Sequence, residues 1–179
     1  MTRLILLFAL LFGLAAPARA EDDSLSALFE ALKAADSASW KRIEDQIWEL
    51  WSRSGSPAMD LLLERGRAAM RDDALDVAIE HLTALVENAP DFAEGWNARA
   101  TAYYQAGLIG PALADIAHTL TLEPRHFGAL TGLGLILEET GDSRGAIRAY
   151  EAALAIHPYR PDLREAIDRL EDELQGEFI

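Results

Sequence analysis

The sequence predicts an all-α solenoid built from short helical hairpins. Pro90, Pro124 and Pro158 recur at an interval of 34 residues, and apolar residues between them recur at the spacing of one helical face. A fixed period of this size indicates a repeat architecture, in which each unit is too small to bury its own apolar face. We therefore divide residues 59–160 into three units, 59–92, 93–126 and 127–160.

Residues 1–20 have the layout of a secretory signal peptide. Arg3 precedes an apolar run over residues 4–16, and small residues at Ala18 and Ala20 predict cleavage after Ala20. The run is shorter than the roughly 20 residues that span a bilayer. We therefore expect secretion across the inner membrane into the periplasm, with retention of the segment as an anchor as the alternative. No later segment is apolar enough for direct membrane insertion.

Residues 21–58 predict a degenerate helical hairpin that lacks the small residues and the terminal proline of the units. We expect Trp40 and Trp51 to lie in its core, because aromatic side chains bury large areas. Trp48 lies about 100° around the helix from Ile47, off the apolar stripe. It is a second possible contact, for a partner or for another copy of the chain. Residues 52–57, rich in Ser, Gly and Pro, predict a short joint.

The middle unit, 93–126, predicts two helices joined by a turn. Trp96, Ala100 and Tyr103 share one helical face, and Gly107 supplies the turn. The small residues Ala100 and Ala112 allow two helix axes to approach closely, while the large ones fill the spaces between turns. The terminal proline ends the second helix.

The third unit and the C-terminal segment follow the same logic. Gly134, Ala146, Tyr150 and Pro158 occupy the repeat-packing positions of residues 127–160. Residues 161–179 predict a C-terminal capping helix and tail, with one apolar stripe and otherwise charged faces, as the end of a solenoid requires.

Composition and spacing exclude several classes of function. The net charge of −14 opposes phosphate backbones, so nucleic acid is not an expected partner. The chain has no cysteine, and its four histidines form neither an i, i+4 pair nor an HExxH motif, so no metal or other cofactor is expected. No nucleophile elbow or ordered triad appears, so we predict no enzyme activity. His126 and His157, beside the inter-repeat prolines, are expected at the surface.

Trp96, Ala100, Tyr103, Gly107, Ala112 and Pro124, at a 34-residue period, resemble the signature of the tetratricopeptide repeat family. The resemblance implies a right-handed α-solenoid whose first helices line a concave groove, in which an extended peptide or a helix of another protein lies. Carried over by register, the resemblance implies groove positions on each unit. They are Glu64, Arg67, Met70 and Arg71; Glu94, Asn97, Thr101, Tyr104 and Gln105; and Thr131, Leu135, Glu138 and Glu139.

Arg67 and Arg71 lie one helical turn apart in an acidic chain. The family's clamp for a C-terminal carboxylate is incomplete in this chain, but the two arginines project together. With Asn97 and Tyr104 beside them, they are suited to hold a carboxylate or a peptide backbone through charge-assisted hydrogen bonds. The alternative is that Asp60 and Glu64, on the same helix, neutralise Arg67.

The sequence as a whole favours a non-enzymatic scaffold or adaptor that binds another protein in its groove. Two alternatives remain. One is a self-assembling structural protein, a homodimer formed through the Trp-rich hairpin. The other is an accessory subunit of an envelope enzyme.

Overall fold

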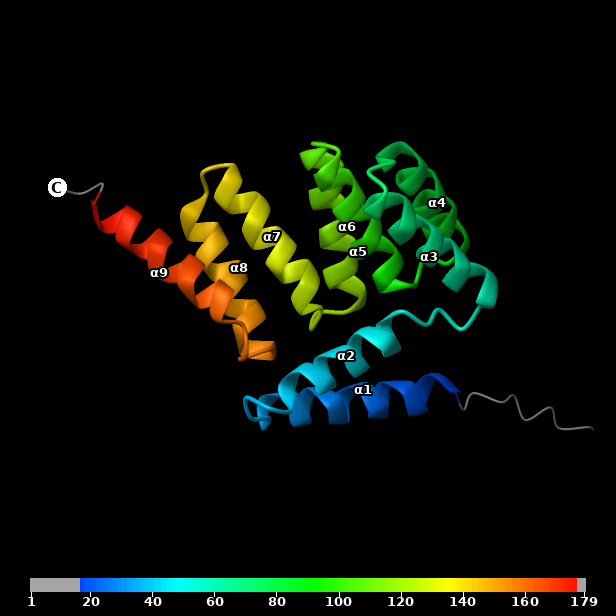
Figure 1. The fold of residues 1–179 in the computed structure, drawn as a ribbon, viewed down its shortest axis with the longest axis horizontal. Coiled ribbons are helices and arrows are strands. Elements are labelled where there is room, and N and C mark those ends of the chain that lie inside the picture. The colour runs from blue at the N-terminus through cyan, green and yellow to red at the C-terminus, as the bar shows by residue number, and fades with distance from the viewer. Residues whose placement is uncertain (1–16, 177–179) are drawn as a thin grey trace, which may run out of the picture.

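A computed structural model describes residues 17–176, with side chains described from Ser24 onward. The expected leader residues 1–16 and tail residues 177–179 lie outside the described part. Within it the chain forms nine α-helices and no strand, which confirms the all-α prediction (Figure 1). The helices are α1 Pro17–Lys33, α2 Trp40–Trp51, α3 Pro57–Arg71, α4 Leu75–Asn88, α5 Ala93–Gln105, α6 Ile109–Leu122, α7 Phe127–Glu139, α8 Ser143–Ile156 and α9 Pro161–Gly176.

The three units become the hairpins α3–α4, α5–α6 and α7–α8. Asp73, Gly107 and Gly141 stand at equivalent turns with φ of 57°, 73° and 85°. This left-handed conformation favours glycine, and aspartate tolerates it better than most residues. The same backbone turn therefore recurs in all three units.

Small residues bring the two helices of each unit into contact. A Cβ added at Gly66 would lie 2.5 Å from Leu82 Cγ, and one at Gly134 would lie 2.3 Å from Tyr150 Cε1. Each glycine thus leaves the space that a large partner fills. The other packing positions include residues that are buried and residues that stay partly or fully exposed. Ala100, Ala112, Ala146 and Tyr150 are buried, Trp96, Tyr103 and Pro158 are half-buried, and Pro124 is exposed.

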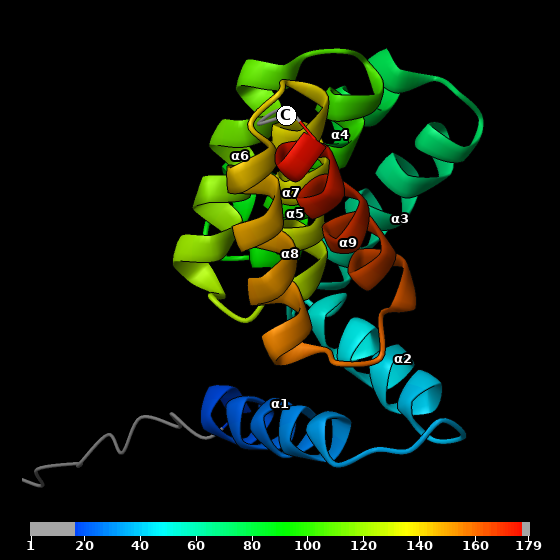
Figure 2. The same ribbon diagram turned by 90° about the vertical axis from the view of Figure 1, so that its left-hand side faces the viewer.

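The first helices of the units, α3, α5 and α7, contact one another in succession, and in Figure 2 α3 and α9 lie on the side of the array opposite α6. Helix α9 packs on α8 through Leu163 and Leu170, which are buried with Tyr150 and Ala153. The remaining faces of α9 are largely charged, as expected for a solenoid end. No helix between residues 17 and 176 is both long and apolar enough to span a lipid bilayer.

The hairpin α1–α2 does not stack on α3 as a further repeat. It crosses beneath the lower ends of α7 and α8 (Figure 1), where Phe29, Ile47 and Trp51 form one core cluster with Phe127 of α7. The joint to α3 is short, and Gly55 within it has φ of 79°. Helix α1 begins at Pro17, so the expected cleavage after Ala20 would fall within its first turns.

Candidate functional site

A groove lies between the inner helices α5 and α7, and we call it the α5–α7 groove. It has a volume of about 290 Å³. Its floor is apolar, and its rim carries uncharged polar side chains. The lining residues are Asn97, Ala100, Thr101, Tyr104, Gln105, Ile116, Gly128, Ala129, Thr131, Gly132, Leu135 and Ile136. Small residues hollow it: the nearest atom to a Cβ added at Gly132 would be Ile116 Cδ1, at 3.7 Å.

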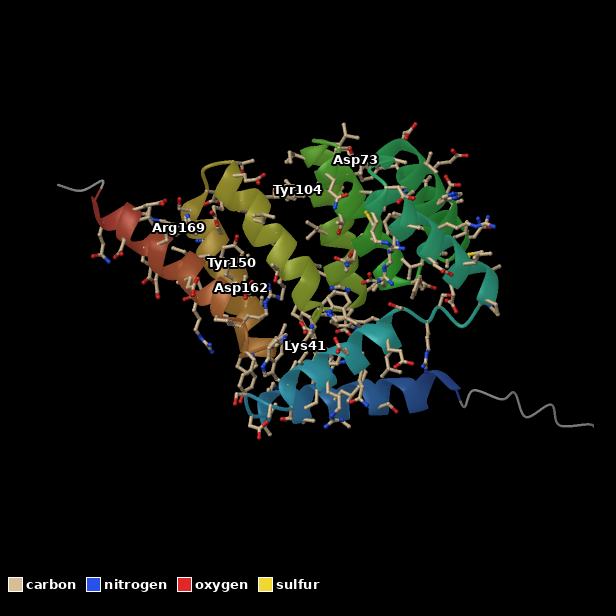
Figure 3. The ribbon with its side chains drawn as sticks, in the orientation of Figure 1. Lys41, Asp73, Tyr104, Tyr150, Asp162 and Arg169 are labelled. Atoms are coloured by element: carbon tan, nitrogen blue, oxygen red, sulfur yellow. The ribbon has the colours of Figure 1, made fainter. Side chains whose placement is uncertain are left out.

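Side chains stand at both ends of this groove. At the start of α7, a Cβ on Gly128 would lie 2.6 Å from Cη2 of Trp48, so the indole occupies that end. At the other end the Tyr104 hydroxyl donates a hydrogen bond to Glu139 (Figure 3). That hydrogen bond raises the pKa of Tyr104 to about 12, so the phenol keeps its proton. The groove is therefore hollow in the middle and bounded at both ends.

A buried polar network centred on Glu94 lies beside the hairpin end of the groove. Glu94 is 3% exposed, and its carboxylate accepts hydrogen bonds from Arg67 at 2.5 Å and from Asn97 at 3.1 Å. Arg67 also donates to the Ser52 hydroxyl at 3.0 Å. Because a buried carboxylate is costly without partners, these side chains hold one another and are not free for a ligand.

His126 completes this network and joins it to the hairpin. Its Nδ1 accepts the backbone N–H of Ala129 at 3.1 Å, which caps α7. In the neutral ring Nε2 then carries the proton, and it donates to Glu94 Oε2 at 2.9 Å. The ring stacks on Trp51 with centroids 4.1 Å apart and planes 7° apart. One imidazole thus connects α2, α5 and α7.

A second buried histidine, His157, fixes the other end of the hairpin. Its Nδ1 accepts the Tyr159 backbone N–H at 3.3 Å, and its Nε2 lies 3.3 Å from Glu44 Oε1. The His157 Nε2 and Glu44 Oε1 atoms are close, but their geometry is not that of a hydrogen bond. Burial lowers the pKa of His157, while the Glu44 charge opposes that shift. Trp40 stacks on Tyr159, whose hydroxyl donates to the Ala35 carbonyl.

The structure separates the predicted groove residues into two groups. One group shares the α5–α7 groove: Asn97, Thr101, Tyr104, Gln105, Thr131 and Leu135. The other residues lie elsewhere or are already engaged. Met70 packs on the core, Glu64, Arg67 and Arg71 line a separate hollow along α3, and Glu138 accepts hydrogen bonds from Tyr150 and Arg169.

Arg67 is neither free to hold a ligand nor neutralised by Asp60 or Glu64. Its partner is Glu94 of the next unit, at 2.5 Å. Asp60 instead accepts hydrogen bonds from Ser54, one from the backbone N–H at 2.7 Å. Arg71 is exposed and forms no ion pair with any described residue.

One expectation from the sequence is wrong. His126 and His157 are wholly buried and not at the surface, because the hairpin folds over the segments that follow α6 and α8. Trp48 is half-buried against Trp51, His126 and Phe127 of its own chain. Its position between the hairpin and α7 could not be read from the periodicity of α2 alone.

The groove floor also contains residues that the sequence argument missed, namely Ile116, Gly128, Ala129, Gly132 and Ile136. The recurrence of small residues along α7 was the signal that could have located it. Among the described residues, no three His, Asp or Glu side chains gather as a metal site requires.

Comparison with known proteins places this arrangement in a family, although no family model matches the chain. A TPR repeat-containing protein from Rhizobium etli is 34% identical over 153 residues, covering 85% of this chain and 75% of the relative.

Solved structures share the fold. The Sgt2 TPR domain from Aspergillus fumigatus has a TM-score of 0.63 at 24% identity, covering 68% of this chain and 82% of that one. The first TPR of Spaghetti (RPAP3), bound to the HSP90 peptide SRMEEVD, has a TM-score of 0.64 at 20% identity, covering 67% and 95%. MamA (AMB-1) covers 84% of this chain and 86% of its own, with a TM-score of 0.59 at 20% identity. The chain belongs to the tetratricopeptide repeat (TPR) protein family.

Proposed function

We propose that this chain is a non-enzymatic protein-interaction module that holds a segment of another protein in the α5–α7 groove. The groove itself carries the proposal, because an apolar floor with an uncharged hydrogen-bonding rim suits a side chain and its neighbouring backbone. The first TPR of Spaghetti, which shares the fold, is bound to a peptide.

The volume of the groove narrows the kind of ligand. About 290 Å³ lies at the lower limit of small-molecule sites. The groove fits one or two apolar side chains of a longer segment, with Thr101 and Gln105 available to pair with its polar groups.

Self-assembly through the hairpin is a weaker alternative. Trp48 and Trp51 contact His126 and Phe127 within the same chain. Trp40 likewise stacks on Tyr159. These rings are used to dock the hairpin, which favours the adaptor over the homodimer.

We also propose that the chain acts in the periplasm after export. The leader-like layout of residues 1–20 supports this. The mass of the chain isolated from an envelope fraction tests it: export predicts a chain that begins at Glu21, whereas a full-length chain in the cytosol would contradict it.

Binding is tested by selecting a displayed library of random 12-residue peptides on residues 21–179. A Gly132→Leu variant fills the groove, and an Ala114→Leu variant adds the same side chain at an exposed position of α6. We expect a set of peptides that the wild type and Ala114→Leu retain and Gly132→Leu loses. If no selected peptide depends on Gly132, binding in this groove is excluded.

A further inference from the structure

Helix α9 continues the inner face of the array. Positions 34 residues apart are equivalent in the repeat. Arg169 of α9 is therefore equivalent to Leu135 of α7 and Thr101 of α5. The structure agrees, because Arg169 of α9 donates to Glu138 Oε1 of α7 at 2.7 Å (Figure 3). The C-terminal helix therefore forms a side of the concave face as well as covering α8.

The groove-equivalent positions of α7 and α9 carry mostly negative charge. We call this set the acidic wall: Glu138, Glu139, Glu165, Asp172 and Glu173. Four of the five residues are exposed, and Glu138 is half-buried. Arg169 is the cation among them, and it is already paired with Glu138 and with Glu173, the latter at 3.5 Å. Because the set has five carboxylates and only one guanidinium, the wall keeps a net negative charge.

The positive groups of the groove do not offset this wall. Arg67 is bound to the buried Glu94, and the α5–α7 groove itself is lined by no charged residue. Arg71 lies on α3, in the separate hollow along that helix. A ligand lying from α5 toward α9 thus meets an uncharged, apolar groove followed by negative charge.

We infer that the segment held here presents an apolar side chain to the α5–α7 groove and lysine or arginine residues to the acidic wall. This inference rests on the proposed function and adds the charge of the partner. Exposed ion pairs contribute little each, but a field of one sign attracts oppositely charged segments and repels acidic ones. A peptide with the acidic composition of SRMEEVD is the wrong ligand for this face.

The display selection separates this inference from the proposed function. Peptides that depend on Gly132 are sequenced, and we expect an apolar residue with at least two nearby Lys or Arg residues. Synthetic copies with every Lys and Arg replaced by Glu should bind at least tenfold more weakly in fluorescence anisotropy. Affinity of the basic copies should fall as salt rises, since salt screens exposed charges.

Two charge-reversal variants provide a matched pair. Glu165→Lys with Asp172→Lys neutralises the net charge of the acidic wall and Arg169, and Glu80→Lys with Glu151→Lys makes the same change in charge on exposed sites of α4 and α8. We expect the first to weaken the basic peptides at least tenfold and the second to leave their affinity within threefold of wild type.

Each other outcome overturns the inference. If groove-dependent peptides are acidic or neutral, or if both variants weaken the basic peptides equally, the proposed function stands and the partner's charge is wrong. If no peptide depends on Gly132, the proposed function and this inference fail together.

Discussion

Replacing Gly134 by alanine should destabilise the protein, although alanine is the better helix former. A Cβ at this position would lie 2.3 Å from Cε1 and 2.4 Å from Cδ1 of Tyr150. Carbon atoms pack at about 3.5–4.0 Å, so the ring must move by about 1 Å. Tyr150 is 3% exposed and donates to Glu138 Oε2 at 3.0 Å. The ring cannot move without disturbing both its packing and this hydrogen bond.

The size of the effect follows from opposing contributions. Overpacking a core costs about 1–3 kcal/mol, and the change from glycine to alanine within a helix returns about 1 kcal/mol. Weakening of the Tyr150 hydrogen bond adds to the loss. We expect a net loss of about 1–2 kcal/mol, which for a chain of this length lowers Tm by about 2–8 °C.

Gly132, two residues earlier in α7, is the matched control. A Cβ there would meet only Ile116 Cδ1, at an ordinary 3.7 Å. The helix-propensity gain is then unopposed, and Gly132→Ala should raise Tm by about 2–4 °C. Thermal unfolding of both variants, followed by circular dichroism in one buffer, gives the comparison. Shifts of the same sign would refute the packing argument.

Three further predictions concern the parts that pack against the array. Trp51→Ala should lower the free energy of unfolding of the hairpin by about 3–5 kcal/mol. The fluorescence change in urea, which comes mainly from the hairpin tryptophans, should therefore occur at a lower urea concentration than the loss of helix measured by circular dichroism. Coincident transitions at the wild-type midpoint would contradict this. Because burial lowers the pKa of His157 from 6.5, the folded state binds fewer protons than the unfolded chain below that pH. The free energy of unfolding should therefore fall as pH drops from 7 toward 5, and His157→Gln should flatten that slope in urea titrations. Truncation after Pro158 removes α9 and uncovers Tyr150 and Ala153. Light scattering should then detect aggregation, whereas a monomeric product would show that α9 is not needed as a cap.

The repeat units were predictable because the features that build them are local. The turn at Gly107 depends on one residue's φ, and the packing of Gly134 on Tyr150 joins positions 16 residues apart within one hairpin. A 34-residue period repeats these local rules three times in one register. The fold class and the division into helices therefore follow from the sequence alone.

The position of the hairpin was not predictable in the same way. Its apolar stripes predict two helices, but they do not specify the surface that buries them. The deciding contacts join Trp51 to His126 and Glu44 to His157, across 75 and 113 positions. A polar residue that is buried only by such a distant segment resembles a surface residue in the sequence. This is why both histidines were expected at the surface.

The groove was predictable in outline and not in its chemistry. The register identified Asn97, Thr101 and Tyr104 as neighbours, because equivalent positions on successive first helices share one face. It could not reveal that Glu94 is buried and holds Arg67, since the two residues lie in different units, 27 positions apart. That pairing removes the cation most suited to a carboxylate ligand and changes the class of partner that the groove favours.

The hairpin α1–α2 also closes one end of the α5–α7 groove. Trp48 occupies the position where Gly128 would otherwise bear a side chain, so a ligand cannot extend past the start of α7 on that side. The network of Arg67, Glu94 and His126 holds α2 in one place relative to α5 and α7. Buried charges of this kind add little net stability, yet they penalise every docking position that leaves one of them unpaired. Packed rings close the Trp48 end. The hydrogen bond between Tyr104 and Glu139 at the other end is exposed to solvent beside the acidic wall, so a ligand approaches the groove from that side.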